Sequence, residues 1–123
     1  MVDINFTGTV TSTMKAIEIM GADNGGNGGI VLNISSLLAL KQNPHLPIYA
    51  ATKAAVLQFS NAIGTELYYA KTQVRVLTVC LGPTDTAILQ RLNLENFSNL
   101  TSSPPERQKV ESAATGILQV INR

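Results

Sequence analysis

A tyrosine and a lysine four residues apart, Tyr49 and Lys53 in the segment PIYAATKAA, could together transfer a proton. At this spacing two side chains share one face of a helix. A lysine ammonium within about 4–6 Å favours the phenolate form of a tyrosine and suits it to acid or base work near neutral pH. The spacing is also compatible with a half-buried helix tyrosine beside a solvated lysine, because chance yields Tyr-x-x-x-Lys in a chain this long about one time in ten.

Two short apolar runs with many β-branched residues flank the segment that carries this pair. Residues 30–35 (IVLNIS) and 74–81 (VRVLTVCL) have the composition of strands buried on both faces of a parallel sheet. Between them, from residue 48 to about residue 70, apolar side chains recur at helical spacing, at Val56, Phe59, Ile63 and Leu67. The order predicts a β-α-β unit with a right-handed crossover.

Further elements are predicted on both sides of this unit. A helix over residues 9–20 has the apolar stripe Val10, Met14, Ile17 and Met20 and ends at Gly21. The segment GADNGGNGG (21–29) is read as a surface connector, with a phosphate loop as the alternative. Near the other end, Ser-x-x-Glu spacing at 103–106 with Pro104 predicts the start of a helix over 108–122, with the stripe Val110, Ala114, Ile117 and Ile121. The leucine-rich segment 88–100 is either a lid over an apolar substrate or a helix packed on the core.

Composition limits the classes of function. The 123 residues, 45% hydrophobic and 14% charged, are most simply one globular domain. A net charge of +1 without runs of either sign argues against nucleic acid and membrane surfaces as partners, and no apolar run approaches the ~20 residues of a membrane span. With one cysteine, Cys80, and one histidine, His45, we expect neither an internal disulfide nor a protein-built metal site. This composition suits a reducing, cytoplasmic location.

Ser36 and the turn at 82–86 follow the two predicted strands, at the edge of the sheet where ligands collect in open α/β folds. Together with NISS at the first strand end, Tyr-x-x-x-Lys thirteen residues after Ser36, and INFTG around Asn5, this order resembles the short-chain dehydrogenase/reductase family. Within the family, NISSLLAL, YAATKAA and DTAIL are most similar to 15-hydroxyprostaglandin dehydrogenase-like and insect alcohol dehydrogenase-like members. The resemblance covers essentially the whole chain.

The resemblance implies roles for individual residues. Four residues match the catalytic tetrad of the family: Asn5, Ser36, Tyr49 and Lys53. The cofactor would be NAD, with NADP as the alternative, and the residues that contact it would be Tyr49, Lys53, Gly82, Thr84 and Thr86. Tyr49 would be the acid/base, Lys53 would bind the nicotinamide ribose, Ser36 would orient the substrate oxygen, and Asn5 would anchor a water linked to Lys53. Each has a structural alternative: a strand-end cap for Ser36, a helix N-cap for Asn5 and a turn-stabilising hydroxyl for Thr86.

The chain departs from the family pattern in two places. No Thr-Gly-x-x-x-Gly-x-Gly loop and no Asn-Asn-Ala-Gly segment is present, and Leu81 stands where the family has the proline of its Pro-Gly turn. Because these segments are missing, we expect residues 1–123 to be the catalytic, C-terminal portion of a single short-chain dehydrogenase domain, truncated at both ends. The fold that the family implies is α/β, a doubly wound, Rossmann-like parallel sheet in three αβα layers.

The implied function is that of an NAD(P)-dependent oxidoreductase that interconverts a secondary alcohol and its ketone. Its substrate would be small and apolar, because Leu37, Leu38 and Leu40 follow Ser36. A full-length protein would be a homodimer. The alternative is a catalytically inactive fragment that at most pairs with, or modulates, longer partners.

Overall fold

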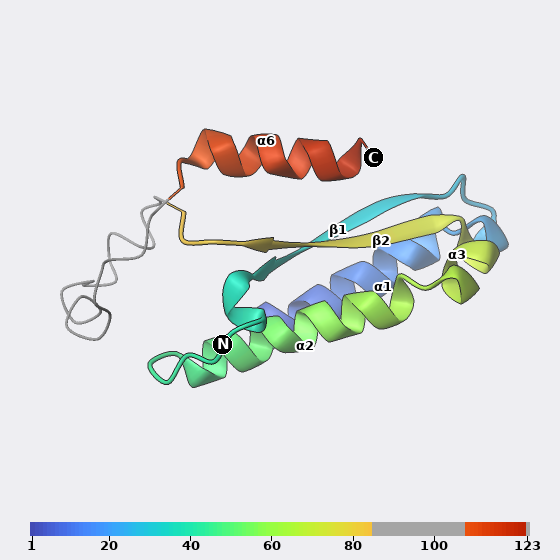
Figure 1. Ribbon diagram of the computed structural model, residues 1–123. Coiled ribbons are helices and arrows are strands. Elements are labelled where there is room, and N and C mark those ends of the chain that lie inside the picture. The colour runs from blue at the N-terminus through green and yellow to red at the C-terminus, as the bar shows by residue number, and fades with distance from the viewer. Residues whose placement is uncertain (85–107, 123) are drawn as a thin grey trace. The chain divides into compact units, whose positions relative to one another are not determined.

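Two strands and the helices that join and cover them form the part of the chain that carries the predicted chemistry (Figure 1). The computed structural model describes residues 1–84 and 108–122. The chain forms two compact units, Met1–Cys80 and Leu81–Arg123. In the first unit a π-helix (Asp3–Thr7) leads into α1 (Gly8–Met20), followed by β1 (Gly29–Ser36), α2 (Pro47–Ile63), α3 (Glu66–Thr72) and β2 (Val74–Leu81), whose last residue belongs to the second unit.

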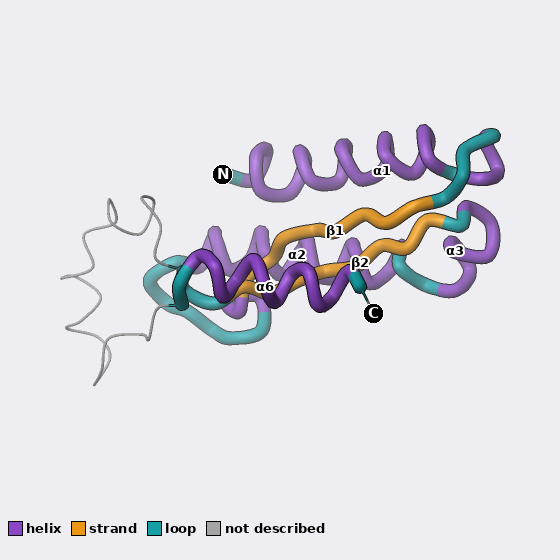
Figure 2. Tube along the Cα trace, turned by 90° about the horizontal axis from the view of Figure 1, so that it is seen from above, coloured by secondary structure: helices purple, strands orange, loops and turns teal. Residues whose placement is uncertain are grey.

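The two strands are neighbours in one parallel sheet (Figures 1 and 2). Because α2 and α3 connect them, the predicted β-α-β order and the α/β fold class are confirmed. The predicted bounds of β2 are also confirmed. The third layer of the expected αβα arrangement stays a prediction.

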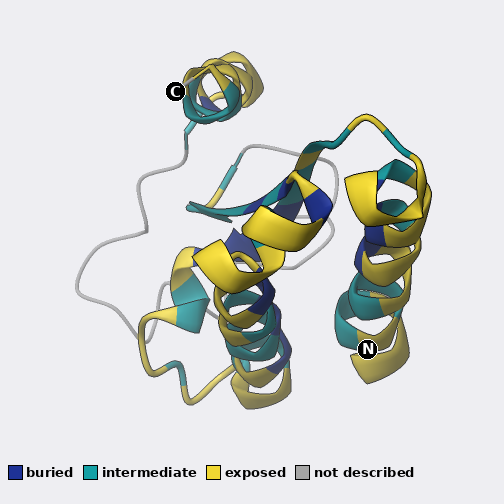
Figure 3. Cartoon of the chain, turned by 90° about the vertical axis from the view of Figure 1, so that its right-hand side faces the viewer, coloured by how far each residue is buried: buried dark blue, intermediate teal, exposed yellow. Residues whose placement is uncertain are grey.

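The core of the first unit lies between the sheet and the helices α1 and α2. Figure 3 shows the buried residues of α1 and α2 on the sides of those helices that face each other. Four buried apolar side chains form one cluster, Ile17, Ile63, Val74 and Val76, and Met20, Val31 and Phe59 pack against it; Val56 of α2 is also fully buried. This core occupies one face of the sheet, since Ile30 and Ile34 of β1 are 40% and 41% exposed. The prediction that β1 is buried on both faces was therefore wrong for this unit, because α1 and α2 cover only the face on which the core lies.

The helix after Tyr49 is shorter than predicted. It ends at Ile63, and Gly64 and Thr65 separate it from α3. A Cβ atom on Gly64 would lie 2.7 Å from the carbonyl oxygen of Val76, so this glycine lets the helix end approach β2. The continuous helix to residue 70 was wrong because of this break, and Leu67 is 79% exposed instead of lying on the buried stripe.

One position of the predicted α1 stripe is also different. Met14 is 44% exposed, and the neighbouring Thr13 is buried in its place. The polar side chain faces inward because it has a hydrogen-bond partner on β1, as described below.

The glycine-rich segment between α1 and β1 is organised by backbone hydrogen bonds. The amide of Gly28 donates to the carbonyl of Met20 at 2.8 Å, and the amide of Gly29 donates to Gln73 at 3.1 Å. Gly28 has a φ of 74°, and a Cβ atom there would lie 2.5 Å from the Gln73 oxygen. The segment is a connector, as predicted, and these amides are already paired within the chain instead of being directed at a phosphate.

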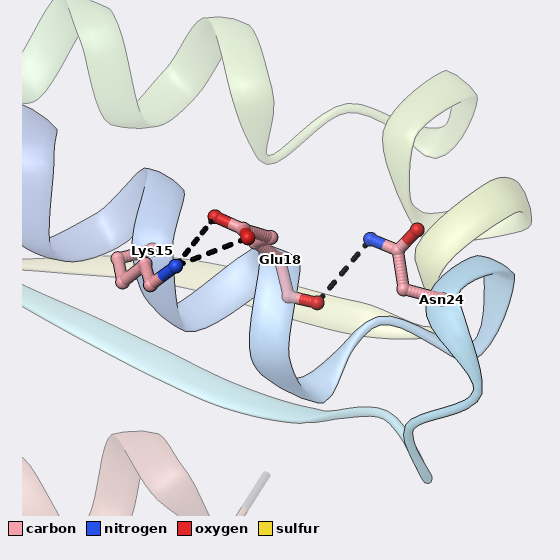
Figure 4. Close-up of polar contacts among 3 residues, drawn as sticks. All are labelled: Lys15, Glu18 and Asn24. Atoms are coloured by element: carbon pink, nitrogen blue, oxygen red, sulfur yellow. Dashed lines mark hydrogen bonds and ion pairs between the residues drawn. The ribbon is translucent and has the colours of Figure 1, made fainter.

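An exposed ion pair lies beside this connector, near the end of α1 (Figure 4). Lys15 Nζ lies 3.0 Å from both carboxylate oxygens of Glu18, and Asn24 Nδ2 donates to the Glu18 carbonyl at 3.2 Å. The Asn24 bond satisfies one of the carbonyls that a helix end leaves without an internal partner. An exposed pair of this kind contributes about 0–1 kcal/mol, so the helix end depends mainly on the backbone bonds of the connector.

The second unit begins at the end of β2. Thr84 and Gln108 form an isolated parallel bridge, in which the Gln108 amide donates to the carbonyl of Pro83 at 2.9 Å. Helix α6 (Val110–Ile121) follows, and Lys109 is extended with a ψ of 151°. The predicted start at residue 108 was wrong because the backbone of Gln108 is engaged in this bridge.

The buried side of α6 also differs from the predicted stripe. Ala113 is buried, whereas Ala114 is exposed and Val110 is 50% exposed. The capping-box residues 103–106, the leucine-rich segment 88–100 and Thr86 lie outside the described residues.

Residues 1–84 and 108–122 contain neither a helix that could span a membrane nor a cluster of metal-ligating side chains. No helix in these ranges combines the length and the apolar character needed to cross a membrane. In the same ranges, no three His, Cys, Asp or Glu side chains lie close enough together to hold a metal ion. Cys80, in β2, is half-buried and forms no disulfide.

Candidate active site

Tyr49 and Lys53 lie on one face of the first two turns of α2. The helix begins at Pro47, whose fixed φ suits the first position of a helix. The ammonium nitrogen of Lys53 is 5.8 Å from the centroid of the Tyr49 ring, within the range of a cation–π contact. The expectation that these two side chains share a helical face is confirmed.

Lys53 is also attached to the last residues of β1. Its Nζ atom donates to the carbonyl of Ile34 at 3.1 Å, and its own carbonyl accepts from Ser35 Oγ at 2.7 Å. Burial lowers the pKa of the Lys53 amine below its ordinary value of 10.5, because desolvation disfavours the charged form. The strand end and the second turn of α2 are therefore joined through this one residue.

Ser36 is the last residue of β1 and is buried. Its Oγ accepts from the amide of Leu38 at 3.1 Å and so caps the 3₁₀ helix Leu37–Ala39. This is the structural role that serine at a strand end commonly has. The bond uses a lone pair of the hydroxyl oxygen and leaves its proton available for a second interaction.

Asn5 lies in the π-helix that precedes α1. Its Nδ2 atom donates to Thr52 Oγ1 at 3.1 Å, and Thr52 Oγ1 donates to the carbonyl of Tyr49 at 2.8 Å. The alternative of a helix N-cap was wrong, because Val2 has helical angles and the helix is already formed at Asn5. Asn5 therefore reaches Tyr49 through one intervening side chain, and its predicted water contact stays a prediction.

The residues of the predicted cofactor turn belong to the second unit. Thr84 Oγ1 donates to the carbonyl of Gly82 at 3.1 Å and accepts from Gln108 Nε2, also at 3.1 Å. Thr84 thus has the turn-stabilising bond that the sequence suggested as an alternative for Thr86. The cofactor contacts of Gly82, Thr84 and Thr86 stay predictions.

Sequence reasoning missed the hydroxyls of Ser35 and Thr52, both of which are buried and bonded to the backbone of α2. It also missed a buried network that connects three elements. Asn33 in β1 accepts from Thr13 Oγ1 of α1 at 3.0 Å and donates to Ser60 Oγ of α2 at 2.8 Å. The signal in the sequence was Asn33, a polar residue in the middle of an apolar strand, because a buried polar side chain needs a hydrogen-bond partner.

These contacts define a scaffold under Tyr49 and Lys53. Among the described residues, every buried side-chain nitrogen or oxygen has a hydrogen-bond partner. Two donors, the Tyr49 phenol and the Lys53 ammonium, are held on one helix face, an arrangement suited to a substrate oxygen and a sugar diol. The residues present therefore fit the nicotinamide ribose end of a dinucleotide.

Comparisons with known proteins give one consistent result. Residues 1–96 match the family model described as short chain dehydrogenase. Alcohol dehydrogenase 1 of Ceratitis cosyra is 39% identical over 125 residues, which cover 97% of this chain and 49% of that protein. Alcohol dehydrogenase 2 of Ceratitis capitata is 37% identical over 125 residues, covering 97% and 48%.

A comparison with solved structures points to the same family. The matched structure is a short chain dehydrogenase from Burkholderia cenocepacia in complex with NADP, with a TM-score of 0.72 and 25% identity. The match covers 99% of this chain and 46% of that one. The chain thus spans about half the length of the curated relatives it matches.

Proposed function

We propose, because this chain belongs to the short-chain dehydrogenase family, that it carries the proton-transfer part of an NAD(P)-dependent alcohol dehydrogenase site. The reaction would interconvert a secondary alcohol and its ketone. The observation that carries the proposal is the Lys53 ammonium 5.8 Å from the Tyr49 ring centroid, anchored at the end of β1. The similarity to the Ceratitis alcohol dehydrogenases supports the predicted insect-type subgroup, whereas a closer relation to 15-hydroxyprostaglandin dehydrogenase stays a prediction.

The side chains of this chain would handle the proton. When bound, the nicotinamide dinucleotide supplies or accepts the hydride. The Tyr49 phenol would give a proton to the substrate oxygen or take one from it, and the Lys53 ammonium would bind the hydroxyls of the nicotinamide ribose. The unused proton of the Ser36 hydroxyl would orient the same oxygen.

The cofactor and the substrate are proposed on different grounds. NAD follows from the insect-type resemblance, and NADP is supported by the solved relative, which is in complex with NADP. An apolar substrate is supported by the leucines that follow Ser36, since Leu37 is 39% and Leu40 is 63% exposed. Both leucines lie within four residues of the Ser36 hydroxyl along the chain.

The proposal is tested by replacing Tyr49 with phenylalanine. The chain is titrated with NADH and NADPH while cofactor fluorescence is followed, and oxidation of secondary alcohols is then assayed. Tyr49→Phe should lower kcat by about 10²–10⁴-fold because the proton-transfer group is lost, while cofactor affinity changes little. Tyr68→Phe, at a 40% exposed tyrosine of α3, is the matched control and should retain activity. Unchanged turnover in Tyr49→Phe would remove the proton-transfer role.

A second candidate is a non-enzymatic chain that associates with another copy or with a longer relative. Exposed apolar side chains on the first helical stretch favour it, since Ile4 is 81% and Ile19 is 65% exposed. Analytical ultracentrifugation distinguishes the two candidates when it is combined with the titration. A dimer that binds neither NADH nor NADPH would support this candidate over the enzyme.

A further inference from the structure

We propose that Thr52 is a positioning residue that transmits the position of the π-helix, through Asn5, to Tyr49. The inference rests on the proposed function insofar as Tyr49 transfers a proton. Thr52 lies three residues after Tyr49 in α2 and is 4% exposed. Its hydroxyl connects a side chain from one helix to the backbone of the residue that would do the chemistry.

The direction of the two hydrogen bonds is determined by the chemistry of the groups. The Asn5 amide nitrogen can only donate, so Thr52 Oγ1 must accept that bond through a lone pair. The single hydroxyl proton is then available for the Tyr49 carbonyl, which can only accept. The three groups therefore form one ordered chain of donors and acceptors, and loss of the hydroxyl breaks both links.

The π-helix offers a firm attachment for this chain. The carbonyl of Asn5 accepts from Thr9 Oγ1 at 2.9 Å, one turn further along. The next residue, Phe6, contacts Phe59 of α2 edge to face, with ring centroids 6.4 Å apart. The hydrogen bond from Asn5 to Thr52 and the ring contact between Phe6 and Phe59 thus hold the π-helix against α2 at two points.

Tyr49 needs such support because it lies in the first turn of α2. The first turn of a helix frays readily, since its amides have no partners within the helix. The second turn is held separately, because the Lys53 carbonyl accepts from Ser35. Without the Thr52 bonds, the Tyr49 ring would move relative to Lys53, and a shift of about 1 Å can lower a rate by about 10²-fold.

The kinetic test compares three threonine variants. Thr52→Val keeps the shape but removes both bonds, and should lower kcat by about 10–100-fold with little change in KM. Thr52→Ser keeps the hydroxyl and should recover most of kcat. Thr72→Val is the matched control, because Thr72 is also buried, donates to Tyr68 and accepts from Val74; it should leave kcat unchanged.

Asn5→Ala tests whether the two side chains act as one unit. The double variant Asn5→Ala/Thr52→Val should be no slower than Thr52→Val alone, because both changes break the same chain of bonds. Additive losses would show that Asn5 acts by another route and would overturn the relay. Should Thr52→Val fail to fold, Asn5→Ala alone removes the first link of the chain, and an unchanged kcat in this variant would overturn the relay.

A second readout does not depend on turnover. In NMR spectra of the folded chain, the Tyr49 ring protons should show contacts to the Lys53 methylenes. Thr52→Val should weaken these contacts and speed amide exchange in the first turn of α2, whereas Thr52→Ser and Thr72→Val should not. Unaltered contacts and exchange in Thr52→Val would overturn the inference. If the unsubstituted chain has no dehydrogenase activity, the proposed function fails, and these spectra still decide the role of Thr52.

Discussion

The two ends of β1 are held in place by different kinds of bonds. At the amino end, Gly28 and Gly29 bond through their amides to the carbonyls of Met20 and Gln73. At the carboxyl end, the links to α2 run through the side chains of Ser35 and Lys53. Backbone bonds at the first end need no particular functional group but restrict the backbone to a shape that favours glycine, whereas the second end requires particular functional groups.

This difference indicates how the chain combines a stable scaffold with a chemical site. Glycine permits close approach of backbone segments where no chemistry is expected. Hydroxyl and ammonium groups secure the end where the predicted catalytic residues lie. Substitutions should therefore act through backbone strain at the amino end and through lost polar partners from the middle of β1 onward.

The largest effect is expected at Asn33, in the middle of the strand. Asn33→Ala should lower the free energy of unfolding by about 2–4 kcal/mol, because Thr13 and Ser60 lose their buried partner. Replacing all three polar residues together, as Thr13→Val/Asn33→Leu/Ser60→Ala, should cost less than the single change, since no unpaired group remains. Urea unfolding measures the free energy of unfolding of both variants. Equal losses in the two would mean that the hydrogen bonds of this network do not contribute to stability.

The next effect tests the amino end of β1. Gly28→Ala should cost about 2–3 kcal/mol, because its φ of 74° disfavours other residues and a Cβ would meet the Gln73 oxygen. Gly25→Ala has a similar φ of 85° but nothing within 4 Å, so it should cost only about 1 kcal/mol. Equal losses in thermal or urea unfolding would show that close approach to Gln73 contributes nothing.

The smallest effect concerns the charge of Lys53, which is bonded to the carboxyl end of β1. Because burial lowers the pKa of Lys53, the unfolded chain binds more protons than the folded chain between that lowered pKa and 10.5. The free energy of unfolding of the native chain should therefore rise with pH across this window. Lys53→Met should lose this part of the rise, whereas Lys71→Met, at a side chain 74% exposed, should keep it. Parallel pH profiles for Lys53→Met and the native chain would contradict the burial of this amine.

The sequence predicted features that depend on local pattern. The bounds of β2, the end of α1 at Gly21 and the shared face of Tyr49 and Lys53 follow from apolar periodicity, glycine and residue spacing. The break at Gly64 could not be predicted in this way, because it depends on the closeness of Val76 in β2.

The polar contacts were missed for a related reason. Thr52 looks like any helix threonine until Asn5, 47 residues earlier in the chain, is placed beside it. The partners of Asn33 come from two different helices, so no local sequence pattern predicts them. Periodicity reports which side of an element is apolar, whereas a hydrogen-bond partner depends on tertiary arrangement.

The π-helix at Asp3–Thr7 has a consequence for how this chain tolerates changes in length. A π turn contains about one residue more than an α-helical turn. Deleting one residue there would restore α geometry and leave Thr13 and Ile17 pointing toward the sheet. The same deletion within residues 8–12 would rotate that face by roughly 100° and turn it away from β1. A deletion in the π-helix therefore spares the face that α1 packs against β1, and its effect falls on the contacts that Asn5 and Phe6 make with α2.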